Sequence, residues 1–249
     1  MLCACAGGPP PRSPSGAVVP ALAPWQIPQG AYGSQRLYRV SYSGPEGEGS
    51  FRVTLRLVAP PRYQLQAVDP VGRSLWSLDV VDDAGLWLNH RNRTYCRFAG
   101  KLDVSGVPLG PFPLLSLPSL LLGRVPAEPA AGSPTATPRG RTFDFRDETN
   151  RHWYGTLGEE GLVVSWTLAE GSSPKVWWLR RDDWEILSDR DRGVQVRWRE
   201  VLREGLSGEP SRLEPPAGYR QTGCGDQEVP GAAPAPPAGE ELTPPPTSF

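Results

Sequence analysis

The sequence predicts a mainly β protein of the α+β class, and three observations carry this prediction. Between residues 36 and 200, apolar and polar side chains alternate with a period of two, as in Phe51, Val53, Leu55 and Leu57. Short turn-like segments join the alternating stretches, and one leucine-rich stretch interrupts them. Because strands with one apolar face are typical of antiparallel sheets, we expect neighbouring hairpins around a short helix.

The alternation predicts about twelve strands. The links between them carry turn signals such as Asp69-Pro70-Val71-Gly72, and short links favour a meander in which each strand pairs with the next. In chain order, the predicted strands span residues 36–43, 49–59, 62–68, 74–81, 85–90, 93–99, 141–147, 151–157, 161–168, 174–181, 183–189 and 193–202.

The leucine-rich segment 110–126 predicts a short helix, in which Pro118 either confines the helix to the C-terminal half or kinks it. The segment is apolar on nearly all sides, so this helix must be buried on several faces. A curved sheet that wraps around the helix would provide that burial.

Both ends of the chain are rich in proline and glycine. Leu2-Cys3-Ala4-Cys5 is similar to a bacterial lipobox, in which Cys5 is the lipid attachment site; this supposes that the signal peptide begins upstream of Met1. The alternative is a low-complexity start with two chance cysteines. We expect a flexible tether at 1–20, a folded domain at 21–208 and a proline-rich, largely disordered tail at 209–249.

The composition excludes several classes of function. The net charge of −1 argues against a nucleic-acid partner, and no apolar stretch is long enough to span a membrane as a helix. The nucleophile-elbow, phosphate-loop and H-E-x-x-H motifs are absent, and His90 and His152 are interpreted as surface imidazoles. We therefore expect no catalytic residues, no metal site and no cofactor.

The cysteines fit no zinc-binding pattern, because no C-x-x-C pair occurs. Cys96 and Cys224 leave two alternatives open. In an oxidising compartment they would form a disulfide that pins the C-terminal tail to a central strand; otherwise they are two free thiols.

Three segments, taken in order, resemble the outer-membrane lipoprotein receptor family LolB and the wider LolA-like superfamily. They are RYQLQAVDPVGRSLWSLDV (62–80), GLWLNHRNRTYCR (85–97) and PLLSLPSLLLGRVP (113–126), and the likeness extends over residues 36–201. The resemblance implies an incomplete antiparallel β-barrel that encloses the helix and holds acyl chains on its concave face. The chain departs from the family in its incomplete signal peptide, its long proline-rich tail and its tryptophan-rich second half.

The alternation indicates which side chains face the concave side, and helix leucines complete the expected lining of an acyl cavity. Such a cavity needs volume and apolar walls rather than specific polar groups. The alternative is that these residues form an ordinary core without a ligand. The predicted cavity residues are Phe51, Val53, Leu55, Leu57, Tyr63, Leu65, Trp76, Leu78, Leu86, Leu88, Leu114, Leu117, Leu121, Trp166 and Trp198.

Val71 lies at the tip of a turn, where polar residues are usual. In the family that the chain resembles, an exposed apolar residue at this turn enters the lipid bilayer and helps to deliver the cargo. The resemblance therefore implies that Val71 inserts into the membrane. The alternative is a valine that packs locally at a hairpin tip.

The resemblance implies a monomeric, non-enzymatic protein, lipid-anchored to the outer membrane and facing the periplasm. It would bind acyl chains of lipoproteins or other lipids and deliver them to the inner leaflet of the outer membrane, with a periplasmic carrier protein as a further partner. Two alternatives remain: a LolA-like binder of another lipid, and a structural envelope lipoprotein that mediates protein contacts without a lipid ligand.

Overall fold

The computed structural model describes residues 23–45, 47–99, 116–131 and 141–224. The helices in this part are η1 (Gln29–Ala31), α1 (Leu117–Leu121) and η3 (Glu159–Gly161). The strands are β1 (Ser34–Gly44), β2 (Gly47–Ala59), β3 (Arg62–Val68), β4 (Ser74–Val81), β5 (Ala84–Asn89), β6 (Thr94–Ala99), β7 (Thr142–Arg146), β8 (His152–Leu157), β9 (Val163–Glu170), β10 (Ser173–Arg181), β11 (Trp184–Asp189), β12 (Val194–Gly205) and β13 (Arg220–Gln221).

All thirteen strands belong to one sheet, in the order β13-β6-β5-β4-β3-β2-β1-β12-β11-β10-β9-β8-β7. Two antiparallel meanders, β1–β6 and β7–β12, meet where β1 pairs with β12. The sheet is not closed, because its end strands β13 and β7 do not pair with each other. The predicted mainly β class, the open sheet and the meander are confirmed. Strand β13 was not among the predicted strands, because its two residues are too few to show an alternation.

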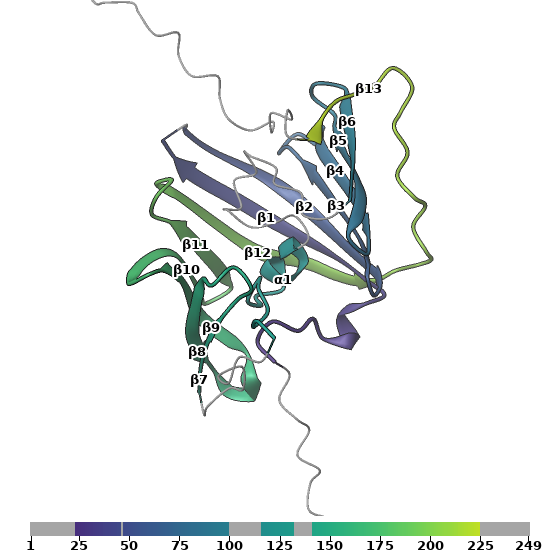
Figure 1. The fold of residues 1–249 in the computed structure, drawn as a ribbon. Helices are drawn as coiled ribbons and strands as arrows, with labels where there is room; N and C mark the ends of the chain where they lie inside the picture. The colour runs from purple at the N-terminus through teal and green to yellow at the C-terminus, as the bar shows by residue number, and fades with distance from the viewer. Residues whose placement is uncertain (1–22, 46, 100–115, 132–140, 225–249) are drawn as a thin grey trace, which may run out of the picture.

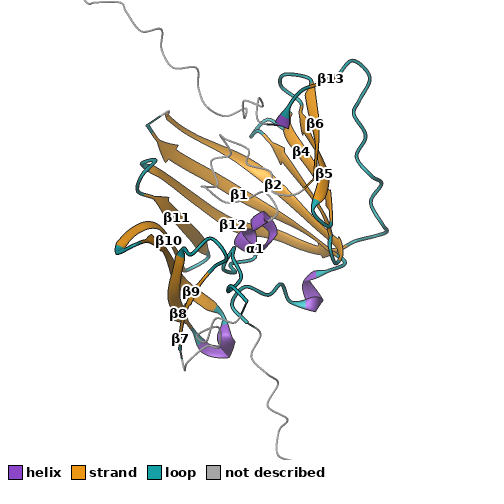
Figure 2. Ribbon diagram, in the orientation of Figure 1, coloured by secondary structure: helices purple, strands orange, loops and turns teal. Residues whose placement is uncertain are grey.

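The sheet bends strongly around α1, which lies on its inner, concave side (Figure 1; Figure 2 separates helix from strand by colour). The inner-face side chains and α1 form one hydrophobic core. Trp76 and Trp87 stack in it with ring centroids 4.9 Å apart, and Leu117, Leu120 and Leu121 of α1 are at most 1% exposed. The leucine-rich segment therefore supplies the core that the curved sheet needs, as expected.

The two meanders repeat the same hairpin plan. In the first, the turn residue Asp82 has φ 56° between β4 and β5; in the second, Asp182 has φ 56° between β10 and β11. Val80 pairs with Gly85 beside the first turn, and Arg180 pairs with Glu185 beside the second. Corresponding positions in the two halves can therefore be compared directly.

The placement of Leu86 and Leu88 on the concave face is wrong. Paired residues of antiparallel strands share a face, and Leu78 pairs with Trp87, so Trp87 occupies the inner face of β5. Leu86 pairs instead with Asp79 on the outer face. Both leucines are nevertheless buried, so β5 is covered on both of its faces. Apolar and polar residues therefore do not alternate in its sequence.

Helix α1 begins with Pro118 in its first turn, where a missing N–H costs nothing. Its last residue is Leu121, and Gly123, whose φ is +66°, follows the C-cap residue Leu122. The Arg124 N–H donates to the Ser119 carbonyl (2.8 Å) and the Gly123 N–H to the Leu120 carbonyl (3.0 Å), the Schellman pattern of a helix end. Helix α1 therefore lies in the C-terminal part of the predicted segment, whose residues 110–115 lie outside the described residues.

The segment 206–224 runs from the end of β12 to β13 along the outer side of the first meander (Figure 1). The Gln64 side-chain amide donates to the Ser211 carbonyl, and the Leu213 N–H donates to the Asp79 carboxylate. The predicted domain end at 208 therefore falls inside the described structure, and residues 209–224 pack on the sheet. Residues 225–249 and the predicted tether at 1–20 lie outside the described residues.

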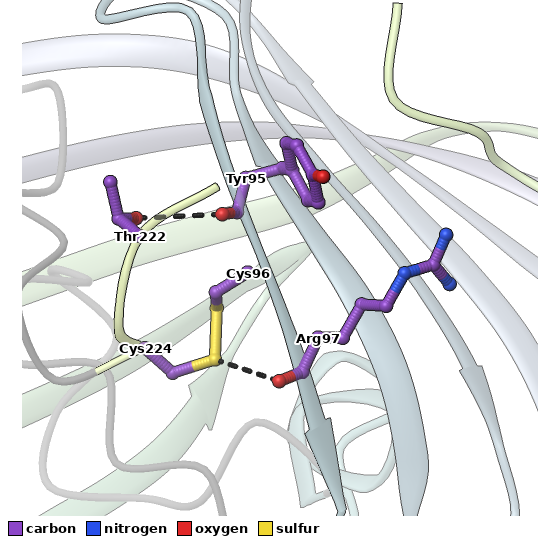
Figure 3. Close-up of a disulfide and its surroundings, with 5 residues drawn as sticks. All are labelled: Tyr95, Cys96, Arg97, Thr222 and Cys224. Carbon is purple, nitrogen blue, oxygen red and sulfur yellow. Dashed lines mark hydrogen bonds between the residues drawn. A yellow bond between two sulfur atoms is a disulfide. The ribbon is translucent and has the colours of Figure 1, made fainter. Parts of the chain in front are cut away.

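A disulfide joins Cys96 of β6 to Cys224, with Cα atoms 5.2 Å apart (Figure 3). The Thr222 hydroxyl lies 3.4 Å from the Tyr95 carbonyl oxygen, and Cys224 Sγ lies 3.4 Å from that of Arg97. Of the two alternatives that the sequence left open for these cysteines, the structure has the disulfide.

Candidate functional site

A cavity of about 490 Å³ opens where the hairpin turns of the first meander meet the concave face; we call it the rim cavity. Apolar groups of Tyr42, Phe51, Leu75 and Trp76 form part of its wall, and charged or polar groups surround its edge. The volume falls within the range of about 300–1,000 Å³ that is usual for small-ligand sites. The remaining lining residues are Gly49, Ser50, Asp69, Arg73, Ser74, His90 and Arg91.

The β3–β4 turn beside the rim cavity is held by one carboxylate. Asp69 Oδ1 accepts the N–H groups of Val71 (3.0 Å) and Arg73 (2.9 Å), and Oδ2 lies 2.6 Å from Arg73 Nε. Burial opposes ionisation of Asp69, but the hydrogen bonds from Arg73 outweigh it and lower the pKa of this carboxyl. Gly72, with φ +92°, completes the turn.

This turn presents Val71 to solvent. Its side chain is 77% exposed, more than any other large apolar side chain in the described part of the chain. The structure therefore offers no local packing that would explain an apolar residue at this position.

A second turn has the same pattern of hydrogen bonds and shows whether this turn geometry requires a valine. Asp147 Oδ1 accepts the N–H groups of Thr149 (2.9 Å) and Arg151 (3.0 Å), just as Asp69 accepts those of residues two and four positions later. The position that Val71 occupies in one turn is occupied by Thr149 in the other. Since the geometry accepts threonine, it does not require the valine.

Most of the predicted cavity residues are packed in the core. Phe51 and Trp76 line the rim cavity, and Leu114 lies outside the described residues. The inner-face placement holds for Phe51, Val53, Leu55, Leu57, Tyr63, Leu65, Trp76, Leu78, Trp166 and Trp198, and Leu117 and Leu121 join them from α1. These residues of the concave face are therefore buried in the core, and the rim cavity lies at the edge of this face.

His90 lies at the edge of the rim cavity and is half-buried, although the sequence suggested a surface imidazole. Its Nε2 is 2.8 Å from the Ser77 hydroxyl and its Nδ1 is 2.9 Å from the Tyr219 hydroxyl. Burial lowers the pKa of His90. These contacts connect the cavity edge to the C-terminal segment, and sequence spacing alone could not reveal them.

Within the described ranges, no group of three or more His, Cys, Asp or Glu side chains is arranged to hold a metal ion. None of the described helices has the length and apolar character needed to cross a membrane. The proposed lipid attachment site, Cys5, lies outside the described residues.

Comparison with known proteins finds solved structures of similar fold. A DUF1329 family protein from Desulfovibrio piger has a TM-score of 0.48 at 8% identity, with 70% of this chain and 86% of that one covered. A LolA superfamily protein from Nitrosomonas europaea has a TM-score of 0.48 at 8% identity, covering 75% and 90%. A proposed outer membrane lipoprotein-sorting protein domain from Vibrio parahaemolyticus has a TM-score of 0.44 at 8% identity, covering 72% and 88%.

No protein-family model matches the chain, and no curated protein matches it. At 8% identity and a TM-score of 0.48, the similarity to these solved structures transfers no residue roles to this chain.

Proposed function

We propose that this protein is a non-enzymatic carrier or receptor that takes up acyl chains of lipoproteins or other lipids at the rim cavity and passes them to a membrane. One observation carries the proposal: a cavity with a partly apolar wall opens beside Val71, the most exposed large apolar side chain described. A bilayer that receives the Val71 side chain would lie next to the cavity, so an acyl chain would have a short path between them.

The proposed setting is the bacterial envelope, with a lipid anchor at Cys5 and the protein facing the periplasm from the outer membrane. The Cys96–Cys224 disulfide supports an oxidising compartment. Burying one valine contributes about 1.5 kcal/mol, which is useful only beside a second membrane contact. A covalent lipid at Cys5 would supply that contact. A periplasmic carrier protein that hands over the cargo belongs to the same proposal.

The test is native mass spectrometry of the full chain, purified without detergent from a bacterial periplasm. We expect extra mass that disappears on organic extraction and that is identified as a lipid or lipopeptide. Its chemistry would separate a lipoprotein receptor from a binder of another lipid.

A matched pair of variants locates the ligand. Ser74 lines the rim cavity and is exposed, so Ser74→Trp would occlude the cavity without disturbing the core. Ser173, exposed at the start of β10, provides the control Ser173→Trp. Retention of lipid by both variants would exclude the rim cavity.

The alternative function is a structural envelope protein that mediates protein contacts only. The observation that favours it is that most of the predicted cavity residues are buried in one hydrophobic core. A clean unliganded mass, with no uptake of added acyl ligand, would establish this alternative over the carrier.

A further inference from the structure

A second cavity, of about 600 Å³, lies at the opposite strand ends from the rim cavity; we call it the basal cavity. It forms where the start of β1, the end of β12 and the β10–β11 hairpin meet the residues that follow α1. Leu121 and Leu122 supply an apolar wall. Its charged lining comprises Arg36, Arg124, Arg180, Arg203, Glu185 and Glu200, with Asp182 and Asp183 at the exposed hairpin turn.

The two glutamates are already engaged by arginines. Glu200 lies 3.0 Å from Arg36 Nη1 and 2.6 Å from Arg203 Nε, and Glu185 lies 3.3 Å from Arg180 Nη2. At the turn, Asp183 lies 2.9 Å from Arg199. Among the described residues, Arg124 is therefore the arginine of this lining that has no carboxylate partner.

Arg124 is only 7% exposed, and its Nη1 is buried without a hydrogen-bond acceptor among the described residues. Burial and the like charge of Arg180 both lower its pKa. A buried guanidinium without a partner is costly, and such groups call for a physical explanation. The donor that faces no acceptor is suited to an anion.

The fold holds Arg124 at this place. The Schellman end of α1 directs the chain from Gly123 into Arg124, and a Cβ on Gly123 would lie 2.1 Å from Arg180 Nη2 and 3.0 Å from Glu185 Oε1. A side chain at position 123 would therefore displace the Arg180 guanidinium, and the φ of +66° also favours glycine there. The helix end and the ion pair form one close-packed unit with Arg124 beside it.

The repeat shows that the β sheet does not need charges here. At the register position of Arg180 and Glu185, the first meander has Val80 and Gly85. The same hairpin plan is thus compatible with an uncharged pair. The ion pair of the second meander, like Arg124, requires an explanation other than sheet formation.

We propose that the basal cavity binds an anionic phosphate or carboxylate group, with Arg124 as the principal donor and Arg180 and Arg36 beside it. Guanidinium groups bind such oxyanions through paired, charge-assisted hydrogen bonds. The apolar wall next to the arginines fits an amphiphile, whose charged end would occupy the site. This last step rests on the proposed lipid-binding function and adds a second lipid site to the rim cavity, whereas the anion site itself rests on the arginines.

The experiment is isothermal titration calorimetry of the full chain with three probes: decyl phosphate, decanol and inorganic phosphate. Arg124→Gln removes the charge, and Arg124→Lys keeps the charge without the forked donors. Arg39→Gln is the control, because Arg39 also lies in β1 but is exposed and does not line the basal cavity. Circular dichroism checks the fold of each variant, and Arg124→Lys carries the comparison if Arg124→Gln does not fold.

We expect the wild type and Arg39→Gln to bind decyl phosphate at least about tenfold more tightly than decanol. Arg124→Gln should lose this preference and Arg124→Lys should weaken it, while decanol binding stays unchanged. Equal binding of inorganic and decyl phosphate, lost in Arg124→Gln, would support the anion site with a free anion as its ligand.

Two results would overturn the inference. Decanol binding that a phosphate group does not improve would remove the anion site and leave the proposed lipid function standing. Failure of the wild type to bind any of the three probes would remove both.

Discussion

Arg180 Nη2 lies 3.3 Å from Glu185 Oε1 on the concave side of the sheet, at the position that Val80 and Gly85 occupy in the first meander. Burial raises the pKa of Glu185 to about 7, although Arg180 and the nearby indole N–H groups of Trp198 and Trp178 act in the opposite direction. A carboxyl group inside the protein therefore titrates near neutral pH.

This pKa makes the stability of the protein depend on pH. Glu185 binds its proton more tightly in the folded state than at its ordinary pKa of 4.5, so its contribution is complete below pH 4.5 and is lost as the pH rises to about 7. Arg180, Arg124, Glu200 and Tyr38 line the same cavity. Across this window, we expect the free energy of unfolding to fall by on the order of 3 kcal/mol relative to Glu185→Gln.

Urea unfolding of the wild type and Glu185→Gln at about pH 5 and pH 8 measures this difference. Parallel pH profiles for the two proteins would show that Glu185 has the same pKa in the folded and unfolded states, contrary to the expectation.

The sequence predicted the strands well because most of them have one apolar face. The exception is β5, where the continuous apolar run Leu86-Trp87-Leu88 does not indicate which side chains face the inside of the sheet. The two-residue turn between Val81 and Ala84 determines which of them do: counting back from it pairs Leu78 with Trp87. On the outer side, the Leu213 N–H donates to Asp79, the partner of Leu86, and no local pattern indicates a contact with a segment so far along the chain.

The basal cavity was missed because charged residues in strands were assigned to the solvated face. A signal was nevertheless present. In β10, Arg180 lies on the same face of the strand as the core residues Val176 and Trp178. In β11, Glu185 lies on the same face as the core residue Leu187. A charged residue on the apolar face of a strand is predicted to be buried. Arg124, in contrast, is brought to the cavity by tertiary packing after α1 and has no such pattern.

Gly123 provides a second prediction. Gly123→Ala would place a Cβ against Arg180 Nη2 and impose a φ of +66° on a residue with a side chain. Together these effects should destabilise the protein by on the order of 1–3 kcal/mol. Gly30→Ala is the control, because a Cβ there meets nothing within 4 Å. Equal urea midpoints for the two variants would contradict the close packing described for the helix end.

The disulfide provides a third prediction. Cys96 and Cys224 are 128 residues apart, so the bond restricts a long loop of the unfolded chain. Reduction should lower the free energy of unfolding by about 2–5 kcal/mol. Urea unfolding with and without dithiothreitol measures the loss, and Cys224→Ser, which cannot form this bond, should respond little to the reductant. A reductant effect of the same size in both proteins would assign it to other cysteines.

Val71 provides the last prediction, and it tests delivery of the acyl ligand rather than its binding. Val71→Glu places a charge at a solvent-exposed turn that Asp69 and Arg73 hold, so the free energy of unfolding, measured in urea, should stay within about 0.5 kcal/mol of the wild type. Transfer of a bound fluorescent fatty acid to phospholipid vesicles should fall by up to about tenfold, which corresponds to losing the burial of one valine.

Val71→Thr, which copies Thr149 in the matching turn, should reduce transfer less. Val201→Glu changes a valine that is 46% exposed on β12 and serves as the control for added charge. If both glutamate variants transfer ligand at the wild-type rate, Val71 is a turn residue without a membrane role; if both slow transfer equally, the effect is one of net charge and not of the turn.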